Sequence, residues 1–173
     1  GIIVAFLVGI VVFGGIRRIA KVASKLVPFM VGIYLLSAIF ILSSHFSEIP
    51  NLISLILQDA FTGDAVLGGA LGTLIIIGIK RGVFSNEAGT GTEAMAHGAA
   101  KTKEPVREGL VAMMGPFIDT IVVCTITALV ILVSGLYETE ANGVTLTALA
   151  FEKELGSIGK LVLIVAVLNF SLT

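Results

Sequence analysis

Residues 81–100, RGVFSNEAGTGTEAMAHGAA, place a polar segment directly after an apolar run. Serine, asparagine, glutamate, glycine and threonine follow one another here between positions 85 and 93. A bilayer core has no water for unpaired backbone groups, so irregular backbone is tolerated there only where protein buries it or where it lines a cavity. The stretch therefore predicts a broken helix, and a polar break of this kind indicates a binding site for a small polar solute or an ion.

The composition indicates an all-α integral membrane protein in contact with the lipid bilayer. The chain has 173 residues, of which 56% are hydrophobic and 13% charged, whereas soluble domains have about 25% charged residues. The formal net charge of -1 argues against a nucleic-acid partner, which would require a basic face. The single cysteine, Cys124, provides no disulfide framework.

The apolar runs at both ends lead us to interpret residues 1–173 as a single transmembrane domain and an internal piece of a longer polytopic protein. Basic residues gather in residues 16–25 and again in residues 101–108. Because cytoplasmic connections of membrane proteins are rich in lysine and arginine, we expect both segments on the cytoplasmic side. One full span then leads outward between them, and one broken span returns.

The apolar runs set the expected elements. Residues 65–100 are about twice as long as a normal span of ~20 residues, which fits two half-helices joined by an unwound segment. Pro28 should lie in the first turn of the span 26–42, and Pro116 should kink the long run 106–134. Shorter helical segments are expected at 51–61, 145–155 and from 158 onward.

Unwinding the helix would expose carbonyl groups that suit Na⁺ and N–H groups that suit a carboxylate. Glycines in the break permit the required backbone angles and a close approach of the ligand. The alternative is a glycine-rich kink that merely lets helices pack. We predict that the break binds substrate, because a carboxylate at membrane depth costs free energy and is usually kept only for a function. The predicted substrate-binding residues are Ser85, Asn86, Glu87, Ala88, Gly89, Thr90 and Gly91.

Asn86, Thr90 and Asp119 are candidate Na⁺ ligands. Asp119 is an acid inside an apolar run, and such a residue is a functional candidate by default. The alternative for Asp119 is a satisfied interhelical hydrogen bond. Glu93 is explained by its place in the first turn of the second half-helix. His97 is interpreted as a hydrogen-bonded packing residue, with a proton relay as the alternative.

Enzyme functions lack their motifs. The sequence contains no HExxH, no GxSxG and no phosphate loop with its lysine. We therefore expect a protein that is not an enzyme and that uses no organic cofactor.

The sequences GVFSNEAGTGTEAMAHGAAKTKEPVREGL (82–110) and GGIRRIAKVASKLVPFM (14–30) resemble the sodium:alanine/glycine symporter family of the amino acid–polyamine–organocation superfamily. The resemblance implies an inverted-repeat transporter whose first and sixth helices are broken, with residues 65–100 as the sixth. It implies Na⁺-coupled symport of alanine, glycine or a similar small neutral amino acid by alternating access. It also implies a multi-pass protein of the inner (plasma) membrane, completed by further N- and C-terminal helices.

The resemblance adds two Na⁺ candidates near position 173. The eighth helix of the family carries a Phe-Ser-Thr run whose hydroxyls often hold sodium in the superfamily. This sequence has Phe170-Ser171-Leu172-Thr173, so Ser171 matches the run, Leu172 departs from it, and Thr173 is the weaker candidate. A channel-like protein or a non-transporting sensor that uses the same polar break is the alternative function.

Overall fold

The computed structural model describes residues 1–61, 71–87 and 90–170, and these residues form helices and connections without a β-strand. The chain forms two compact units, one of residues 1–44 with 130–173 and one of residues 45–129. The predicted all-α class is confirmed.

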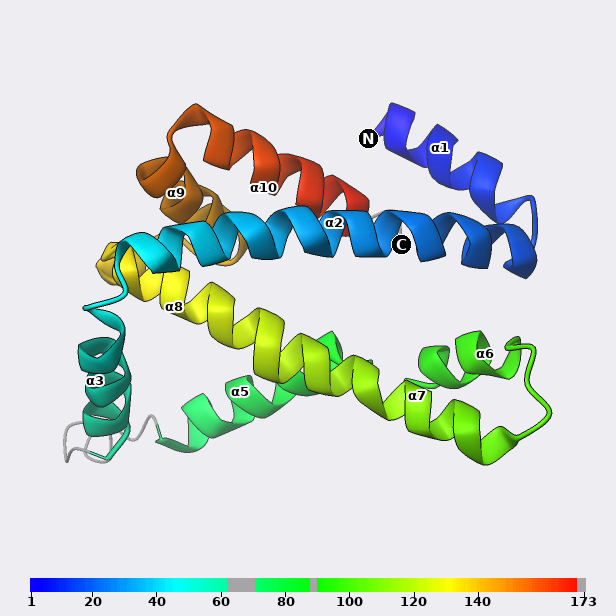
Figure 1. The fold of residues 1–173 in the computed structure, drawn as a ribbon, viewed down its shortest axis with the longest axis horizontal. Helices are drawn as coiled ribbons and strands as arrows, with labels where there is room; N and C mark the ends of the chain where they lie inside the picture. Colours follow the sequence, from blue (N-terminus) through cyan, green and yellow to red (C-terminus); the bar gives the residue numbers. More distant parts are fainter. Residues whose placement is uncertain (62–70, 88–89, 171–173) are drawn as a thin grey trace. The chain divides into compact units, whose positions relative to one another are not determined.

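The first unit contains α1 (Ile2–Val12), α2 (Ile16–Ser44), the 3₁₀ turn η2 (Leu136–Glu138), α9 (Val144–Leu155) and α10 (Ser157–Phe170). Helix α10 packs against both α2 and α9 (Figure 1). The buried side chains come from all three of these helices and include Met30, Tyr34, Phe151, Leu163 and Ala166. This unit therefore has an apolar core of its own.

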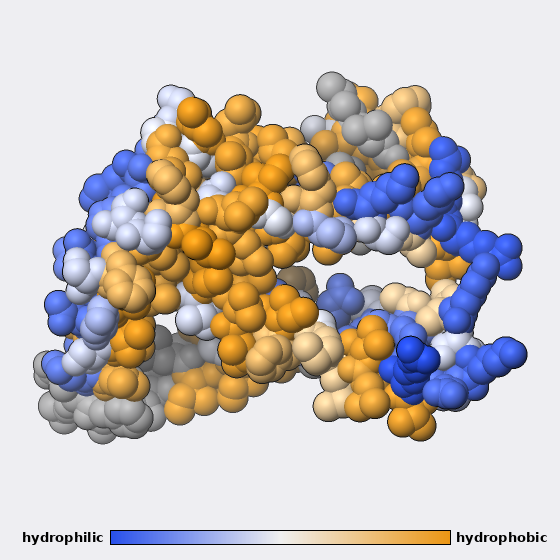
Figure 2. All heavy atoms as spheres, viewed as in Figure 1, coloured by the Kyte–Doolittle hydropathy of each residue, from blue (hydrophilic) through white to orange (hydrophobic). Residues whose placement is uncertain are grey.

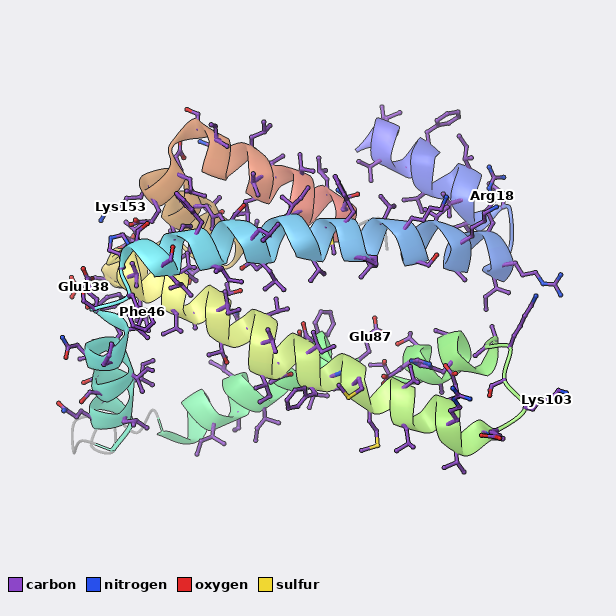
Figure 3. The ribbon with its side chains drawn as sticks, in the orientation of Figure 1. Arg18, Phe46, Glu87, Lys103, Glu138 and Lys153 are labelled. Carbon is purple, nitrogen blue, oxygen red and sulfur yellow. The ribbon has the colours of Figure 1, made fainter. Side chains whose placement is uncertain are left out.

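Helix α9 is fixed to this core at two points. The ring of Phe151, which is fully buried, stacks on Tyr34 with the ring centroids 5.4 Å apart. Lys153, labelled in Figure 3, donates a hydrogen bond from Nζ to the carbonyl of Ser134 over 2.6 Å. Gly159 allows α10 to pass close by, because a Cβ there would lie 2.1 Å from the Phe151 carbonyl oxygen.

Two details of the predicted N-terminal region are wrong. The basic residues 17–25 do not form a separate connection, because they are the first turns of α2, and the connection after α1 is confined to residues 13–15. Pro28 consequently lies inside α2 and not in its first turn. The spacing of Arg17, Arg18, Lys21 and Lys25 is compatible with a helix, and charge alone does not separate a loop from a polar helix end.

The second unit contains α3 (Ile49–Phe61), α5 (Leu71–Ser85), α6 (Thr92–Gly98), α7 (Pro105–Phe117), the π-helical segment η1 (Ile118–Cys124) and the start of α8 (Thr125–Val133). The predicted pair of half-helices is confirmed as α5 and α6. Residues 65–70 of the predicted first half lie outside the described residues.

Residues Ile16–Ser44 and Pro105–Val133 are long and apolar enough to cross a bilayer. Each continuous helical run has 29 residues, whereas a span requires about 20. Much of the face shown in Figure 2 is apolar. In the most apolar stretch of Pro105–Val133, only 6% of the residues are buried. Such exposed apolar surface suits lipid or neighbouring helices.

Replacing Phe151 by alanine should destabilise the first unit. The change removes the ring from a fully buried position beside Tyr34, and such truncations cost about 3–5 kcal/mol. We expect a lower apparent melting temperature of the detergent-solubilised full-length protein. It is measured by size-exclusion chromatography of samples heated to increasing temperatures, as the fraction of protein that still elutes in the folded peak. Phe46→Ala, at a residue that is 75% exposed, serves as the control, and an equal loss of stability in both variants would contradict a core built around Phe151.

Candidate functional site

The helix break lies between Ser85, the last residue of α5, and Thr92, the first residue of α6. Among the described residues of the break, two adopt left-handed backbone angles, Glu87 with φ 53° and Gly91 with φ 86°. Glycine adopts this conformation without a steric penalty, but a non-glycine residue held in it costs about 1–3 kcal/mol. The strain at Glu87 requires local contacts that hold it.

Three side chains of the break hold one another. Thr92 Oγ1 donates a hydrogen bond to the carboxylate of Glu87, which is labelled in Figure 3. Thr90 Oγ1 donates to the Glu87 carbonyl over 2.7 Å and lies 2.9 Å from Thr92 Oγ1. These bonds tie the Glu87 backbone and carboxylate to the start of α6, so the local network offsets part of the backbone strain.

Two further side-chain bonds join the end of α5 to the π-helical segment η1. Ser85 Oγ donates to Asp119 Oδ2 over 2.5 Å, and Thr120 Oγ1 donates to Asn86 Oδ1 over 2.8 Å. Two consecutive residues of the break therefore pair with two consecutive residues of η1. Each interhelical bond of this kind contributes about 0.6–2 kcal/mol in a membrane.

The π-helical turn follows from Pro116, near the end of α7. Proline has no N–H to bond the carbonyl four residues earlier, and its ring crowds that carbonyl. The kink at Pro116 stays a prediction, but the helix type does change after the proline, since the helix widens from Ile118 to Cys124. A wider turn rotates less per residue than an α-helix, and this brings Asp119 and Thr120 closer to one face.

An open cleft of about 250 Å³ lies at the break. Its volume is below the ~300–1,000 Å³ typical of pockets for drug-sized ligands, so a small solute fits best. Within the described part of the chain, the residues that line the cleft carry three carboxyl groups and no lysine or arginine. They are Ser85, Asn86, Glu87, Glu93, Gly115, Pro116 and Asp119. Negative charge of this kind attracts a cation or the ammonium group of a ligand.

Asp119 keeps oxygen lone pairs for such a cation. Among the described residues, its side chain accepts one side-chain hydrogen bond, from Ser85, whereas an ionised carboxylate has about four acceptor sites. The described residues contain no group of three or more histidine, cysteine, aspartate or glutamate side chains that could hold a metal. A monovalent ion held by one carboxylate, amide oxygens and hydroxyls suits this site better than a transition metal.

The structure brings four predicted site residues together around the cleft, namely Ser85, Asn86, Glu87 and Asp119. Thr90 is not among the residues that line the cleft, and its hydroxyl is engaged by Glu87 and Thr92. Gly91 is the N-cap residue directly before α6, with open space where a Cβ would be. The remaining predicted residues, Ala88, Gly89, Ser171 and Thr173, lie outside the described residues.

Sequence reasoning assigned no site role to several residues. The helix dipole alone is enough to explain Glu93 from the sequence, yet Glu93 also lines the cleft. Thr120 carried no signal beyond its hydroxyl, and its partner Asn86 is 34 residues away in the chain. Pro116 is predicted to kink its helix close to Asp119 in the sequence, and the structure adds that Gly115 and Pro116 both line the cleft.

A helical membrane chain with a polar cleft at a broken helix has the architecture of ion-coupled secondary transporters. The family model of the sodium:alanine symporter family matches residues 1–173, which is the whole chain. The chain therefore belongs to the sodium:alanine symporter family. This result confirms the family resemblance that the 82–110 segment carries.

Curated relatives agree with this assignment. The sodium/alanine symporter AgcS of Methanococcus maripaludis is 41% identical over 175 residues, covering 99% of this chain and 38% of the relative. The probable sodium/glutamine symporter GlnT of Bacillus subtilis is 38% identical over 171 residues, which cover 98% of this chain and 36% of the relative. An uncharacterized transporter of Haemophilus influenzae is 43% identical, covering 99% and 39%. The chain thus spans somewhat more than a third of the length of these relatives, which are named as transporters and not as enzymes.

The two bonds between α5 and η1 should be energetically coupled. Ser85→Ala and Thr120→Val each remove one bond, with an expected loss of about 0.6–2 kcal/mol, and the double variant should deviate from additivity by about 0.5 kcal/mol or more. Unfolding of the full-length protein by SDS in mixed micelles measures these losses. Thr147→Val is the control, because that hydroxyl bonds the Gly143 carbonyl at the start of its own helix; strict additivity would show that the two bonds act independently.

Proposed function

We propose that this protein is a secondary active transporter that carries Na⁺ together with a small neutral amino acid, alanine or glycine, by alternating access. The observation that carries the proposal is the negatively charged cleft at the break between α5 and α6, in a chain of the sodium:alanine symporter family. In secondary transporters, broken helices of this kind form the substrate and ion sites.

We assign the Na⁺ site to oxygen ligands on both sides of the cleft. Asp119 supplies a carboxylate from η1, and Asn86 supplies an amide oxygen from the break, each already oriented by a neighbouring hydroxyl. Thr90, Ser171 and Thr173 are further hydroxyl candidates. The Ser85 and Thr120 hydroxyls position the two main ligands, so the site needs little rearrangement when the ion enters.

We assign the substrate to residues 85–91. The three carboxyl groups around the cleft attract the substrate ammonium group, and N–H groups at the start of a half-helix suit the substrate carboxylate. The open space beside Gly91 lets a ligand approach the main chain closely. The cleft volume of about 250 Å³ favours a side chain as small as that of alanine or glycine, although one relative is named for glutamine.

The rest of the relatives' length is needed for transport. By the family resemblance, a second broken helix supplies the other half of the site, and the two inverted repeats move against each other. We place the protein in the inner (plasma) membrane as a multi-pass protein, with Ile16–Ser44 and Pro105–Val133 among its spans.

Uptake by the full-length protein in proteoliposomes tests this function. We expect radiolabelled alanine to accumulate when the external salt is sodium and to stay near background when choline replaces it. Asp119→Asn removes the charge of the main Na⁺ ligand, and loss of a hydrogen-bonded charged partner costs about 1.5–3 kcal/mol. Uptake at low Na⁺ should therefore fall by about tenfold or more.

Asp59→Asn is the matched control, since Asp59 is an exposed carboxylate on α3 and does not line the cleft. Unlabelled glycine in excess should compete with labelled alanine, and glutamine should compete poorly. Uptake that is equal in sodium and choline would contradict the coupling. Binding without flux would favour a sensor, and uptake that does not saturate would favour a channel.

A further inference from the structure

A stripe of positive charge runs along the first turns of α2. Its members, all of them exposed, are Arg17, Arg18, Lys21 and Lys25. Because successive residues of an α-helix are rotated by about 100°, these four positions fall within an arc of about 100° on one face of the helix. The sequence has no acidic residue before Glu48, and none of the four basic side chains forms an ion pair with a described residue. The charge of the stripe is therefore available to an external anion.

The turn before α2 positions one member of the stripe. Gly15 reverses the chain between α1 and α2 with φ 75°, and Figure 3 labels Arg18 at this turn. The stem of Arg18 lies over Gly14, because a Cβ on Gly14 would lie 2.0 Å from Arg18 Cδ and 2.8 Å from Arg18 Cβ. The place of the arginine side chain thus depends on the absence of a side chain at position 14.

Exposed apolar side chains adjoin the stripe. Phe13, in the turn, is 95% exposed, and Ile16, the first residue of α2, is 52% exposed. The helix that follows is long and apolar enough to cross a bilayer, so the stripe lies at the end of a candidate span. At such a position, basic side chains place their charged ends among the headgroups while apolar side chains contact the acyl chains. A free anion would use only the charges, whereas a phospholipid uses both.

We propose that the basic stripe at the start of α2 is a binding surface for anionic phospholipids, with Arg18 oriented by Gly14 toward the phosphate group and with Phe13 and Ile16 against the acyl chains. Guanidinium groups bind phosphate through paired N–H donors, and lysine acts as a point charge. The bound headgroups hold the α1–α2 turn at the membrane surface. The proposal concerns a lipid partner and does not depend on which solute the protein carries.

Native mass spectrometry of the full-length protein in detergent tests this surface with two lipids that differ in headgroup charge. We expect tighter binding of dioleoylphosphatidylglycerol than of dioleoylphosphatidylcholine. Replacing Arg17, Arg18 and Lys21 by glutamine, one after another, should lower the apparent affinity for the phosphatidylglycerol by about fivefold for each charge removed. The affinity for the phosphatidylcholine should stay the same. Equal affinities of the unaltered protein for the two lipids would overturn the proposal.

A second basic segment of the chain provides the matched control. Replacing Lys101, Lys103 and Arg107 by glutamine removes the same charge from a segment that also carries Glu104 and Glu108. This triple variant should bind the phosphatidylglycerol nearly as the unaltered protein does. An equal loss of affinity in the two triple variants would overturn the proposal, because the lipid would then respond to net charge and not to the stripe on α2.

A variant that changes no charge tests the placement of Arg18. Gly14→Ala puts a Cβ where the Arg18 stem lies, and it should lower the affinity for the phosphatidylglycerol by about fivefold, as Arg18→Gln does without altering the turn. Gly9→Ala is the control, since its Cβ would meet the Phe13 ring at an ordinary 3.9 Å. Unchanged affinity in folded Gly14→Ala, or in Arg18→Gln, would overturn the role of Arg18.

Inorganic phosphate separates a lipid surface from a site for a free anion. Added in excess at constant ionic strength, it should leave the phosphatidylglycerol bound, because phosphate lacks the acyl chains that contact Phe13 and Ile16. Displacement of the lipid by inorganic phosphate would show a site for a free anion and would overturn the assignment to phospholipid.

Discussion

The pairing of Ser85 and Asn86 with Asp119 and Thr120 is the interaction on which the site depends. A helix that stops inside an apolar environment leaves polar groups that water cannot reach, and each unsatisfied group costs several kcal/mol. At this break the backbone N–H groups of Asn86, Glu87 and Thr90 are paired with backbone carbonyls, and the polar side chains at the end of α5 find partners on η1. The same pairing gives the carboxylate of Asp119 a hydrogen-bond donor, Ser85, and holds it at the open cleft.

Pro116 helps to define the geometry of this pairing, because it precedes the π-helical turn that carries Asp119 and Thr120. The α-helix gives way to a π-helical turn directly after the proline, and π-helical turns are frequent at functional sites. The turn presents an acid and a hydroxyl to two consecutive residues of the break. On the other side of the break, the threonine network around Glu87 fixes the start of α6. The cleft is thus shaped before a ligand enters, which lowers the cost of binding.

Much of this arrangement could be predicted from the sequence, because the free-energy cost of a polar or charged group at membrane depth depends mainly on its neighbours in the sequence. A polar segment in an apolar run predicts a break, and an acid at membrane depth predicts a role for Asp119. The partners of these residues could not be predicted, since Asn86 and Thr120 are 34 residues apart and their meeting depends on helix register. Charge also misled the prediction for residues 17–25, where a basic helix end resembles a loop. The roles assigned to Ala88, Gly89, Ser171 and Thr173 stay predictions, because these residues lie outside the described part of the chain.

The central claim is that the cleft at the α5–α6 break receives the ligand. A cryo-electron microscopy structure of the full-length protein with alanine and Na⁺ bound tests it most directly. The account predicts density for the amino acid in contact with residues of the break, and density for the ion within coordination distance of Asp119 and Asn86. Ligand density at another position, with the cleft at the α5–α6 break filled by side chains, would contradict it.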